Sequence, residues 1–325
     1  IKNISADIGI KMALETERLG QKDKRITNSF GASFESQESR SFLANSKGFS
    51  GNYNETIYHL GLGLQGGSGD NRVEGYWSST ARHLIEMEKP DEIARKAVQR
   101  TARLLNPRKI GTRNVPVIFE PNMTSWLLGF LFTCISGSSV YKKTSFLADQ
   151  LGQQIAVPDW TVIDDGTMPG KLGSAPFDSE GIPCRKTTVL NKGKLENFLC
   201  DTYAARKLQL ASTGNAQGKS VGPNNFYLKQ GTHKPDDLSA SLEEGLILVR
   251  TIGHGLNPVT GDISRGAYGL WVEKGRILFP VSEITIAGNL GQILKQPVRI
   301  GNDLKFRSPV SGPTIQVAEM TIAGS

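Results

Sequence analysis

Five polar side chains lie in a glycine-dense stretch near the end of the chain, residues 253–269, and could contact a ligand. They are Asn257, Thr260, Asp262, Ser264 and Arg265. The five glycines of this stretch tolerate positive φ angles and allow another backbone to come close. An extended peptide could therefore pair with this segment. We take the five polar residues as candidate substrate-binding residues; the alternative is a pair of tight turns with a structural role only.

The segments on both sides of this stretch have the composition of strands. Residues 245–252 are a β-branched run of strand length, and residues 270–280 have the pattern of strand, turn and strand. A polar loop held between strands is a common place for binding residues.

The same region carries a family resemblance. Residues 257–289, which include PVSEITIAGN, resemble the C-terminal part of the TldD/PmbA family, and residues 138–147 (SSVYKKTSFL), 176–182 and 204–215 agree with it. Family members are described as metalloprotease components and were formerly called modulators of DNA gyrase. Of the two branches of this family, the sequence is more similar to PmbA, also called TldE.

The TldD branch carries an HExxxH zinc motif, and its positions fall here on Leu128, Gly129 and Thr133. Zinc requires imidazole, thiolate or carboxylate ligands, and hydrolysis requires a carboxylate that takes a proton from the bound water. The family's further cysteine ligand is also missing, because the last cysteine is Cys200 and residues 301–313 contain none. We therefore expect no metal, no cofactor and no catalytic residue in this chain.

The resemblance implies a non-catalytic subunit of an intracellular zinc metalloprotease that processes peptides or unfolded proteins. A TldD-like partner would supply the zinc and the catalytic glutamate, and the isolated chain could instead form a homodimer. Two alternatives stay open. One is a self-sufficient hydrolase with an unrecognised site, and the other is a regulatory protein that binds DNA gyrase or DNA.

Acidic residues in predicted loops offer one further place for a cation. Asp164, Asp165 and Asp178 form this group. Carboxylates can bind a cation together, although solvated loop acids are the commoner arrangement.

Charge and hydrophobicity limit the possible partners and location. Lys and Arg outnumber Asp and Glu by 38 to 31, and the densest basic cluster, residues 95–108, fits a solvated helix face at least as well as a phosphate-binding surface. We expect neither a nucleic acid nor a membrane partner. The longest apolar run, residues 126–135, is too short to span a bilayer. The expected location is the cytoplasm.

The pattern of predicted elements indicates an α+β protein with two domains. Residues 1–111 form a mixed α/β domain that ends with a helix at residues 90–106, and we expect this domain to lack its beginning. Residues 112–325 form a β-rich, largely antiparallel domain. One helix of this domain, residues 124–135, is apolar on every side and is expected to be buried.

Overall fold

The structure is a computed structural model and describes residues 4–324. The predicted first residue of the N-terminal domain, Ile1, and the predicted last residue of the second domain, Ser325, lie outside the described residues. The chain forms two compact units, which are described separately below. The second unit begins at Lys109 and also includes Leu43–Gly51 from the turn between the first two strands.

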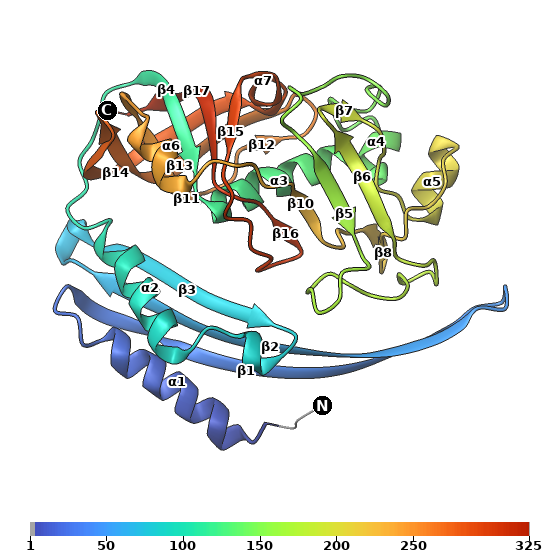
Figure 1. The fold of residues 1–325 in the computed structure, drawn as a ribbon, viewed down its shortest axis with the longest axis horizontal. Helices are drawn as coiled ribbons and strands as arrows, with labels where there is room; N and C mark the ends of the chain where they lie inside the picture. Colours follow the sequence, from blue (N-terminus) through green and yellow to red (C-terminus); the bar gives the residue numbers. More distant parts are fainter. Residues whose placement is uncertain (1–3, 325) are drawn as a thin grey trace. The chain divides into compact units, whose positions relative to one another are not determined.

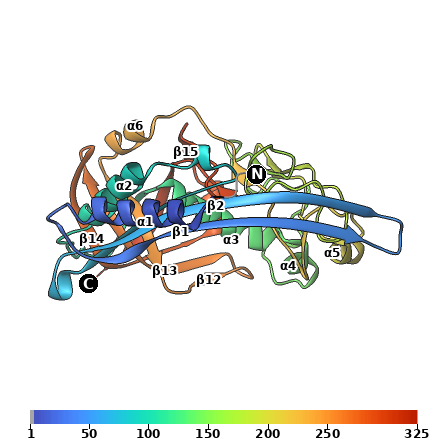
Figure 2. The ribbon, with the colours of Figure 1, turned by 90° about the horizontal axis from the view of Figure 1, so that it is seen from below.

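The first unit is a three-stranded sheet with helices on one face. Its strands β1 (Ile26–Ala44), β2 (Ser50–Gly66) and β3 (Val73–Ala81) are neighbours in this order, and β2 and β3 are antiparallel. Figure 2 shows β1 and β2 as one long hairpin. The helices are α1 (Ala6–Gly20) and α2 (Pro90–Ala102), with two short 3-10 turns, Gly69–Asn71 and Leu84–Glu86.

The core of the first unit follows the alternation of β2. Leu60, Leu62 and Leu64 are fully buried on one face of this strand and pack with Ile93 and Ala97 of α2. Helix α2 begins at the predicted Pro90 but ends at Ala102, before the predicted residue 106. Its end tightens because Leu104 N–H donates to Thr101 O at 3.1 Å instead of continuing the α-helical ladder.

The second unit contains two larger sheets and a small two-stranded sheet. The larger sheets are built from β4 (Arg113–Phe119), β5 (Val162–Asp165), β6 (Lys186–Asn191), β7 (Lys194–Leu195), β10 (Phe226–Leu228), β11 (Glu244–Ile252), β12 (Leu256–Asn257), β13 (Asp262–Glu273), β14 (Arg276–Asn289), β15 (Val298–Ile300), β16 (Val310–Ser311) and β17 (Ile315–Ala323). The small sheet pairs β8 (Ala216–Gln217) with β9 (Ser220–Val221). The helices are α3 (Pro121–Ile135), α4 (Gly137–Tyr141), α5 (Thr202–Leu208), α6 (Pro235–Ala240) and α7 (Leu290–Lys295).

Five strands of the second unit close into a ring. The order is β11, β4, β17, β14 and β13, and β13 pairs again with β11. All pairings in this ring are antiparallel except that of β11 with β4. The other sheet has the order β16, β10, β5, β6 and β7, with one parallel pair, β10 with β16. The predicted α+β class with a β-rich, largely antiparallel C-terminal part is confirmed.

Helix α3 lies between the two sheets of the second unit (Figure 1) and contacts strands of both. Leu127, Leu128 and Leu131 on this helix are almost fully buried, and they belong to one core that also contains Phe119 of β4 and Phe226 of β10. The central helix is therefore fixed on two sides.

Candidate functional site

Helix α3 ends at Ile135, as its sequence predicts, but begins at Pro121, before the predicted residue 124. Pro121 occupies the first helical position, where its missing N–H costs nothing and its fixed φ favours the helix. Ser136 ends the helix in an extended conformation. The described helix is three residues longer at its start than the predicted 124–135, because Thr124 N–H bonds to Glu120 O at 2.9 Å and draws the first turn into the helix.

The three positions that the resemblance assigns to the zinc motif differ in their burial. Leu128 is fully buried in the core. Gly129 faces open space, because a Cβ added there meets no atom within 4 Å. Thr133 is exposed, and its hydroxyl donates to Gly129 O at 3.0 Å. None of the three side chains offers a zinc ligand of the usual kind.

The prediction that α3 is buried on every side is therefore wrong for one face. Asn122, Trp126, Gly129 and Thr133 follow the helical spacing of four, three and four residues, so they share one face. Asn122 and Thr133 are exposed, and Trp126 and Gly129 are half-buried. The sequence pattern did not predict this exposed face, because Gly129 at its centre has no side chain that would mark the position as polar. We call these four residues the open face of α3.

The glycine-dense stretch forms a hairpin of β12 and β13 after the end of β11. At one position of this hairpin, a close backbone contact requires glycine. Gly255 has a φ of 140°, and a Cβ there would lie 1.8 Å from Ser264 O. The glycine thus allows Ser264 N–H to bond to Gly255 O at 2.8 Å. The close packing of the hairpin backbone therefore explains this glycine, and no ligand is needed to explain it.

Three of the five candidate residues stabilise the turn of this hairpin. Asn257 accepts from Val259 N–H at 3.0 Å through its side-chain oxygen. Thr260 donates its hydroxyl proton to Asp262 Oδ2 at 2.5 Å, and Asn289 Nδ2 donates to Asp262 Oδ1 at 2.9 Å. These hydrogen bonds, from Thr260 first and then Asn289, lower the pKa of the Asp262 carboxyl group. The sequence analysis did not identify Asn289, since it lies in the next strand.

Arg265 differs from the other candidates because it reaches α3. Its guanidinium carbon lies 5.4 Å from the centre of the Trp126 ring, and its Nε donates to Ile252 O at 3.5 Å. Asp262 and Ser264 leave β13 on the opposite side from Arg265, because successive side chains of a strand alternate. The five predicted residues therefore do not converge on one point, and only Arg265 borders the open face of α3.

The acidic group is part of a buried network of amides and not a set of solvated loop acids. Asp164 is fully buried and accepts from Asn215 Nδ2 at 2.7 Å, Asn224 N at 2.9 Å and Asn224 Nδ2 at 3.0 Å. Burial raises the pKa of Asp164 to about 6, against the opposing effect of these hydrogen bonds. Asp178 accepts from three backbone N–H groups, of Glu180, Ile182 and Ala216.

Asp165 is also buried, and its Oδ1 accepts from Thr167 N–H at 2.9 Å and from the Thr167 hydroxyl at 2.6 Å. These hydrogen bonds leave the three carboxylates little capacity to bind a cation together. Within residues 4–324, no group of three or more His, Cys, Asp or Glu side chains is arranged to hold a metal ion. The sequence analysis missed Asn215 and Asn224 as partners of Asp164, because they lie more than fifty positions away along the chain.

The cysteines are also poor ligands and nucleophiles in this fold. Cys134, Cys184 and Cys200 are buried free thiols. Burial raises their pKa values to about 12, 11 and 12 respectively. The thiolate is the form that binds metal and attacks carbon, so these three groups are inactive near neutral pH.

Among the described residues, no helix is both long and apolar enough to cross a membrane.

Two family models together match almost the whole chain. The PmbA/TldA metallopeptidase central domain matches residues 1–105, and the C-terminal domain of the same family matches residues 112–324. The chain belongs to the PmbA/TldA metallopeptidase family. The predicted resemblance is confirmed.

The sequence relatives support the PmbA side of this family. The chain is similar to the metalloprotease PmbA of Escherichia coli O157:H7, with 37% identity over 99% of this chain and 71% of that protein. It is similar to the metalloprotease PmbA homolog of Haemophilus influenzae at 36% identity, with the same coverage. A metalloprotease TldD homolog of Buchnera aphidicola is more distant, at 24% identity over 86% of this chain and 59% of that protein.

Solved structures share the fold. A Thermotoga maritima protein described as a candidate modulator of a DNA gyrase has a TM-score of 0.93 at 27% identity, over 98% of this chain and 75% of that one. A Bacteroides thetaiotaomicron protein with a similar description has a TM-score of 0.91 at 28% identity, over 99% and 72%. TldE from Thermococcus kodakarensis has a TM-score of 0.88 at 24% identity, over 99% and 75%, and supports the fold alone.

Proposed function

We propose that this family member is the non-catalytic, PmbA/TldE-like subunit of a cytoplasmic zinc metalloprotease complex. The complex hydrolyses peptides or unfolded proteins, and a TldD-like partner supplies the zinc and the catalytic glutamate. The chain itself contributes a surface that positions the substrate.

The observation that carries this proposal is the side-chain chemistry of α3. Leu128 packs in the core, Gly129 has no side chain, and the Thr133 hydroxyl is bonded to the helix backbone. These residues do not fit a zinc ion, and we assign no hydrolytic step to this chain. The buried cysteines and the amide-bonded Asp164 and Asp178 do not replace the missing ligands.

The open face of α3 and the β12–β13 hairpin support a role in substrate positioning. Arg265 and Trp126 join these two elements and offer a cation and an aromatic surface. Strand β12 pairs with β13 on one side only, within the part of the chain that the structure describes. An extended peptide can add to that free edge through backbone hydrogen bonds.

The test is to purify the chain from native extract and ask whether a protein with an HExxxH motif is purified with it. We expect the chain alone to hold no stoichiometric zinc and to cleave no peptide, and the reconstituted pair to cleave peptides. About one zinc per chain that resists dialysis, or peptidase activity without a partner, would overturn the proposal.

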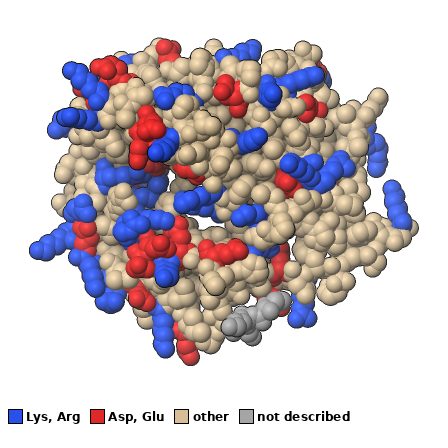
Figure 3. Space-filling model, in the orientation of Figure 1, with Lys and Arg blue, Asp and Glu red and all other residues tan. Residues whose placement is uncertain are grey.

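A regulatory role at DNA gyrase is a second candidate because two structural relatives carry that description. On the face drawn in Figure 3, Lys and Arg side chains are interspersed with Asp and Glu. Such a mixed surface gives less attraction to phosphates than a contiguous basic stripe. Strongly salt-dependent binding to duplex DNA would favour this second candidate.

A further inference from the structure

Helices α4 and α5 pack against each other in the second unit and share an aromatic and basic surface (Figure 1). The rings of Tyr141 and Tyr203 meet edge to face, with 5.6 Å between their centres. Lys142 Nζ lies 5.6 Å from the centre of the Tyr141 ring, and Lys207 Nζ lies 5.6 Å from the centre of the Tyr203 ring. Arg206 is exposed on α5, three positions after Tyr203 and therefore on the same side of the helix. We call these five residues the α4–α5 surface.

The three cations of the α4–α5 surface are available to a ligand. Within residues 4–324, none of Lys142, Arg206 and Lys207 forms an ion pair with a carboxylate. The contacts of the two lysines with tyrosine rings are weak at exposed positions, and they leave the ammonium N–H groups able to bond to a carboxylate. The next residue, Lys143, is already paired with Asp149 and adds no net charge.

Two acids lie at the start of α5, and both bond to this helix. Asp201 Oδ1 accepts from Ala204 N–H at 2.7 Å, and the Glu180 carboxylate accepts from the N–H and the hydroxyl of Thr202, each at 2.8 Å. Two of the cations lie in the last turn of α5, at the other end of the helix. Because three cations face two acids that already have donors, the α4–α5 surface keeps a net positive charge.

The backbone beneath the α4–α5 surface is held firmly. Gly137 N–H of α4 donates to Leu199 O at 2.7 Å, and a Cβ at Gly137 would lie 2.9 Å from Ala204 Cβ of α5. The close approach of the two helices therefore requires glycine at this position. At the end of α5, Leu210 N–H donates to Ala205 O at 2.8 Å. A backbone that is fixed before a ligand arrives lowers the entropic cost of binding.

A short segment connects the α4–α5 surface with the β12–β13 hairpin. Phe146 N–H donates to Pro258 O at 2.9 Å, directly after β12, and Phe146 lies four residues after Lys142. Four residues span at most about 14 Å. A peptide that adds to the free edge of β12 can therefore reach the cations with about four further extended residues.

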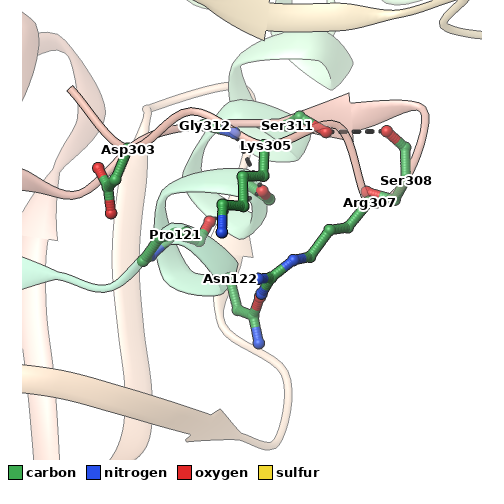
Figure 4. A pocket seen from close by; sticks show the side chains of 9 residues that line it. Pro121, Asn122, Asp303, Lys305, Arg307, Ser308, Ser311 and Gly312 are labelled. Atoms are coloured by element: carbon green, nitrogen blue, oxygen red, sulfur yellow. Dashed lines mark hydrogen bonds between the residues drawn. The ribbon is translucent and has the colours of Figure 1, made fainter. Parts of the chain in front are cut away.

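The pocket at the first turn of α3 has no comparable excess of charge (Figure 4). Its charged residues are Asp303, Lys305 and Arg307. Arg307 already takes part in an interaction, and the charges of Lys305 and Asp303 balance each other. The α4–α5 surface is therefore better suited to an acidic ligand than this pocket.

We propose that the α4–α5 surface binds an acidic segment of a peptide. The inference rests on the proposed function for the role of this peptide as substrate. An extended peptide presents alternate side chains on one face, about 7 Å apart, so successive carboxylates can face successive cations. The two tyrosine rings offer apolar contact between them.

A single-stranded nucleic acid fits the α4–α5 surface less well. Bases bind to such proteins by stacking on the faces of aromatic rings. An ammonium group already lies over each of the two tyrosine rings. Carboxylates need only the N–H groups of the cations, which point to a peptide as the ligand.

The test compares two hexapeptides, both N-acetylated and C-terminally amidated. One alternates alanine with glutamate, the other alternates alanine with glutamine, and each is titrated into the full chain without a partner at low ionic strength. We expect the glutamate peptide to bind about 8-fold more tightly, since each of three exposed ion pairs contributes a factor of about two. Lys142→Gln combined with Lys207→Gln should lower its affinity about 4-fold. Arginine at both positions should keep most of the affinity.

The matched control is Lys234→Gln combined with Lys274→Gln, which removes two exposed lysines at the opposite end of the second unit from α5 (Figure 1). It changes the net charge equally and should leave the affinity for the glutamate peptide unchanged. Equal affinity for the two peptides, no binding of either, or an equal loss in both double variants would overturn the acidic-peptide site. Single-stranded oligothymidylate that binds more tightly than the glutamate peptide would also overturn it, in favour of a nucleic acid. Zinc content and hydrolysis by the reconstituted pair are measured separately, so this inference can fail while the proposed function stands.

Discussion

The guanidinium carbon of Arg265 lies 5.4 Å from the centre of the Trp126 indole ring. This contact joins β13 to the open face of α3, and the same guanidinium group donates to Ile252 O and Gly253 O at the end of β11. One side chain thus connects α3, which holds the positions of the missing zinc motif, with the hairpin that the sequence predicts as a binding loop. Arg265 can be tested separately from the other hairpin residues.

Arg265→Ala should reduce peptide hydrolysis by the reconstituted pair while the protein still folds. A cation–π contact contributes about 0.5–2 kcal/mol, so we expect the free energy of unfolding to fall by no more than about 2 kcal/mol. The measurements are urea denaturation of the chain and the rate of peptide cleavage by the pair. Arg276→Ala, at the start of β14, removes an exposed arginine and serves as the control.

Asp262→Ala is expected to reduce hydrolysis less than Arg265→Ala, because Asp262 leaves β13 on the opposite side and bonds to Thr260 and Asn289. Full activity of the Arg265 variant, or a larger loss in the Asp262 variant, would show that the open face of α3 is not where the hairpin meets the substrate.

Substitutions at the three motif positions of α3 should have effects on stability that differ in sign. Gly129→Ala should stabilise the chain by about 0.5–1 kcal/mol, because alanine favours a helix and its Cβ enters open space. Leu128→His should cost at least about 2 kcal/mol, since it removes a buried leucine and buries an imidazole. Urea denaturation measures both changes. Thr133→His, at an exposed position, is the control for adding an imidazole to this helix.

A Gly129→Ala variant that is less stable than the parent would mean that another group normally covers this face. A Leu128→His variant of normal stability would contradict the placement of Leu128 in the core.

Much of the local structure could be predicted from the sequence because the responsible interactions are local. Helix α2 begins at its predicted Pro90, β11 covers the predicted strand 245–252, and the turn between β13 and β14 lies within the predicted strand, turn and strand of 270–280. Strand β13 begins at Asp262, however, inside the stretch predicted as a loop. The predicted α+β class is also confirmed. These features depend on propensities and alternation within about ten residues.

The parts that could not be predicted depend on contacts between distant segments. The five-stranded ring closes because β11 pairs with both β4 and β13. These strands are far apart in the sequence, so their pairing is known only from the folded chain. Asp164 was interpreted as a loop acid because its amide donors, Asn215 and Asn224, lie far along the sequence.

The three cysteines should resist alkylation in the folded protein. Burial raises the pKa of each thiol to about 11 or 12, so almost no thiolate forms at pH 8. We expect iodoacetamide to label the native chain slowly and to label all three cysteines in concentrated urea. Mass spectrometry of the intact chain counts the adducts. A cysteine that reacts in the native chain as fast as a free peptide thiol would show that its site opens to solvent.

The buried carboxyl group of Asp164 should contribute more to the stability of the chain in mild acid than at neutral pH. Its pKa is raised from 3.8 to about 6 by burial, so the folded state binds this proton more tightly than the unfolded state does. The resulting stabilisation is fully present below pH 4 and is lost as the pH rises through 6. This rise in pKa corresponds to a total effect of about 3 kcal/mol.

The measurement is the free energy of unfolding of the parent chain and of Asp164→Asn, by urea denaturation between pH 4 and pH 7. The asparagine cannot titrate, and its N–H₂ group faces the donors Asn215 and Asn224, so the variant loses a roughly constant amount of stability at every pH. On top of that constant loss, the stability of the parent relative to the variant should fall by about 2 kcal/mol from pH 4 to pH 7. Asp159→Asn, which replaces an exposed carboxylate, should show no such change. A difference between parent and Asp164→Asn that stays constant over this range would mean that the three hydrogen bonds to Asp164 offset the effect of its burial.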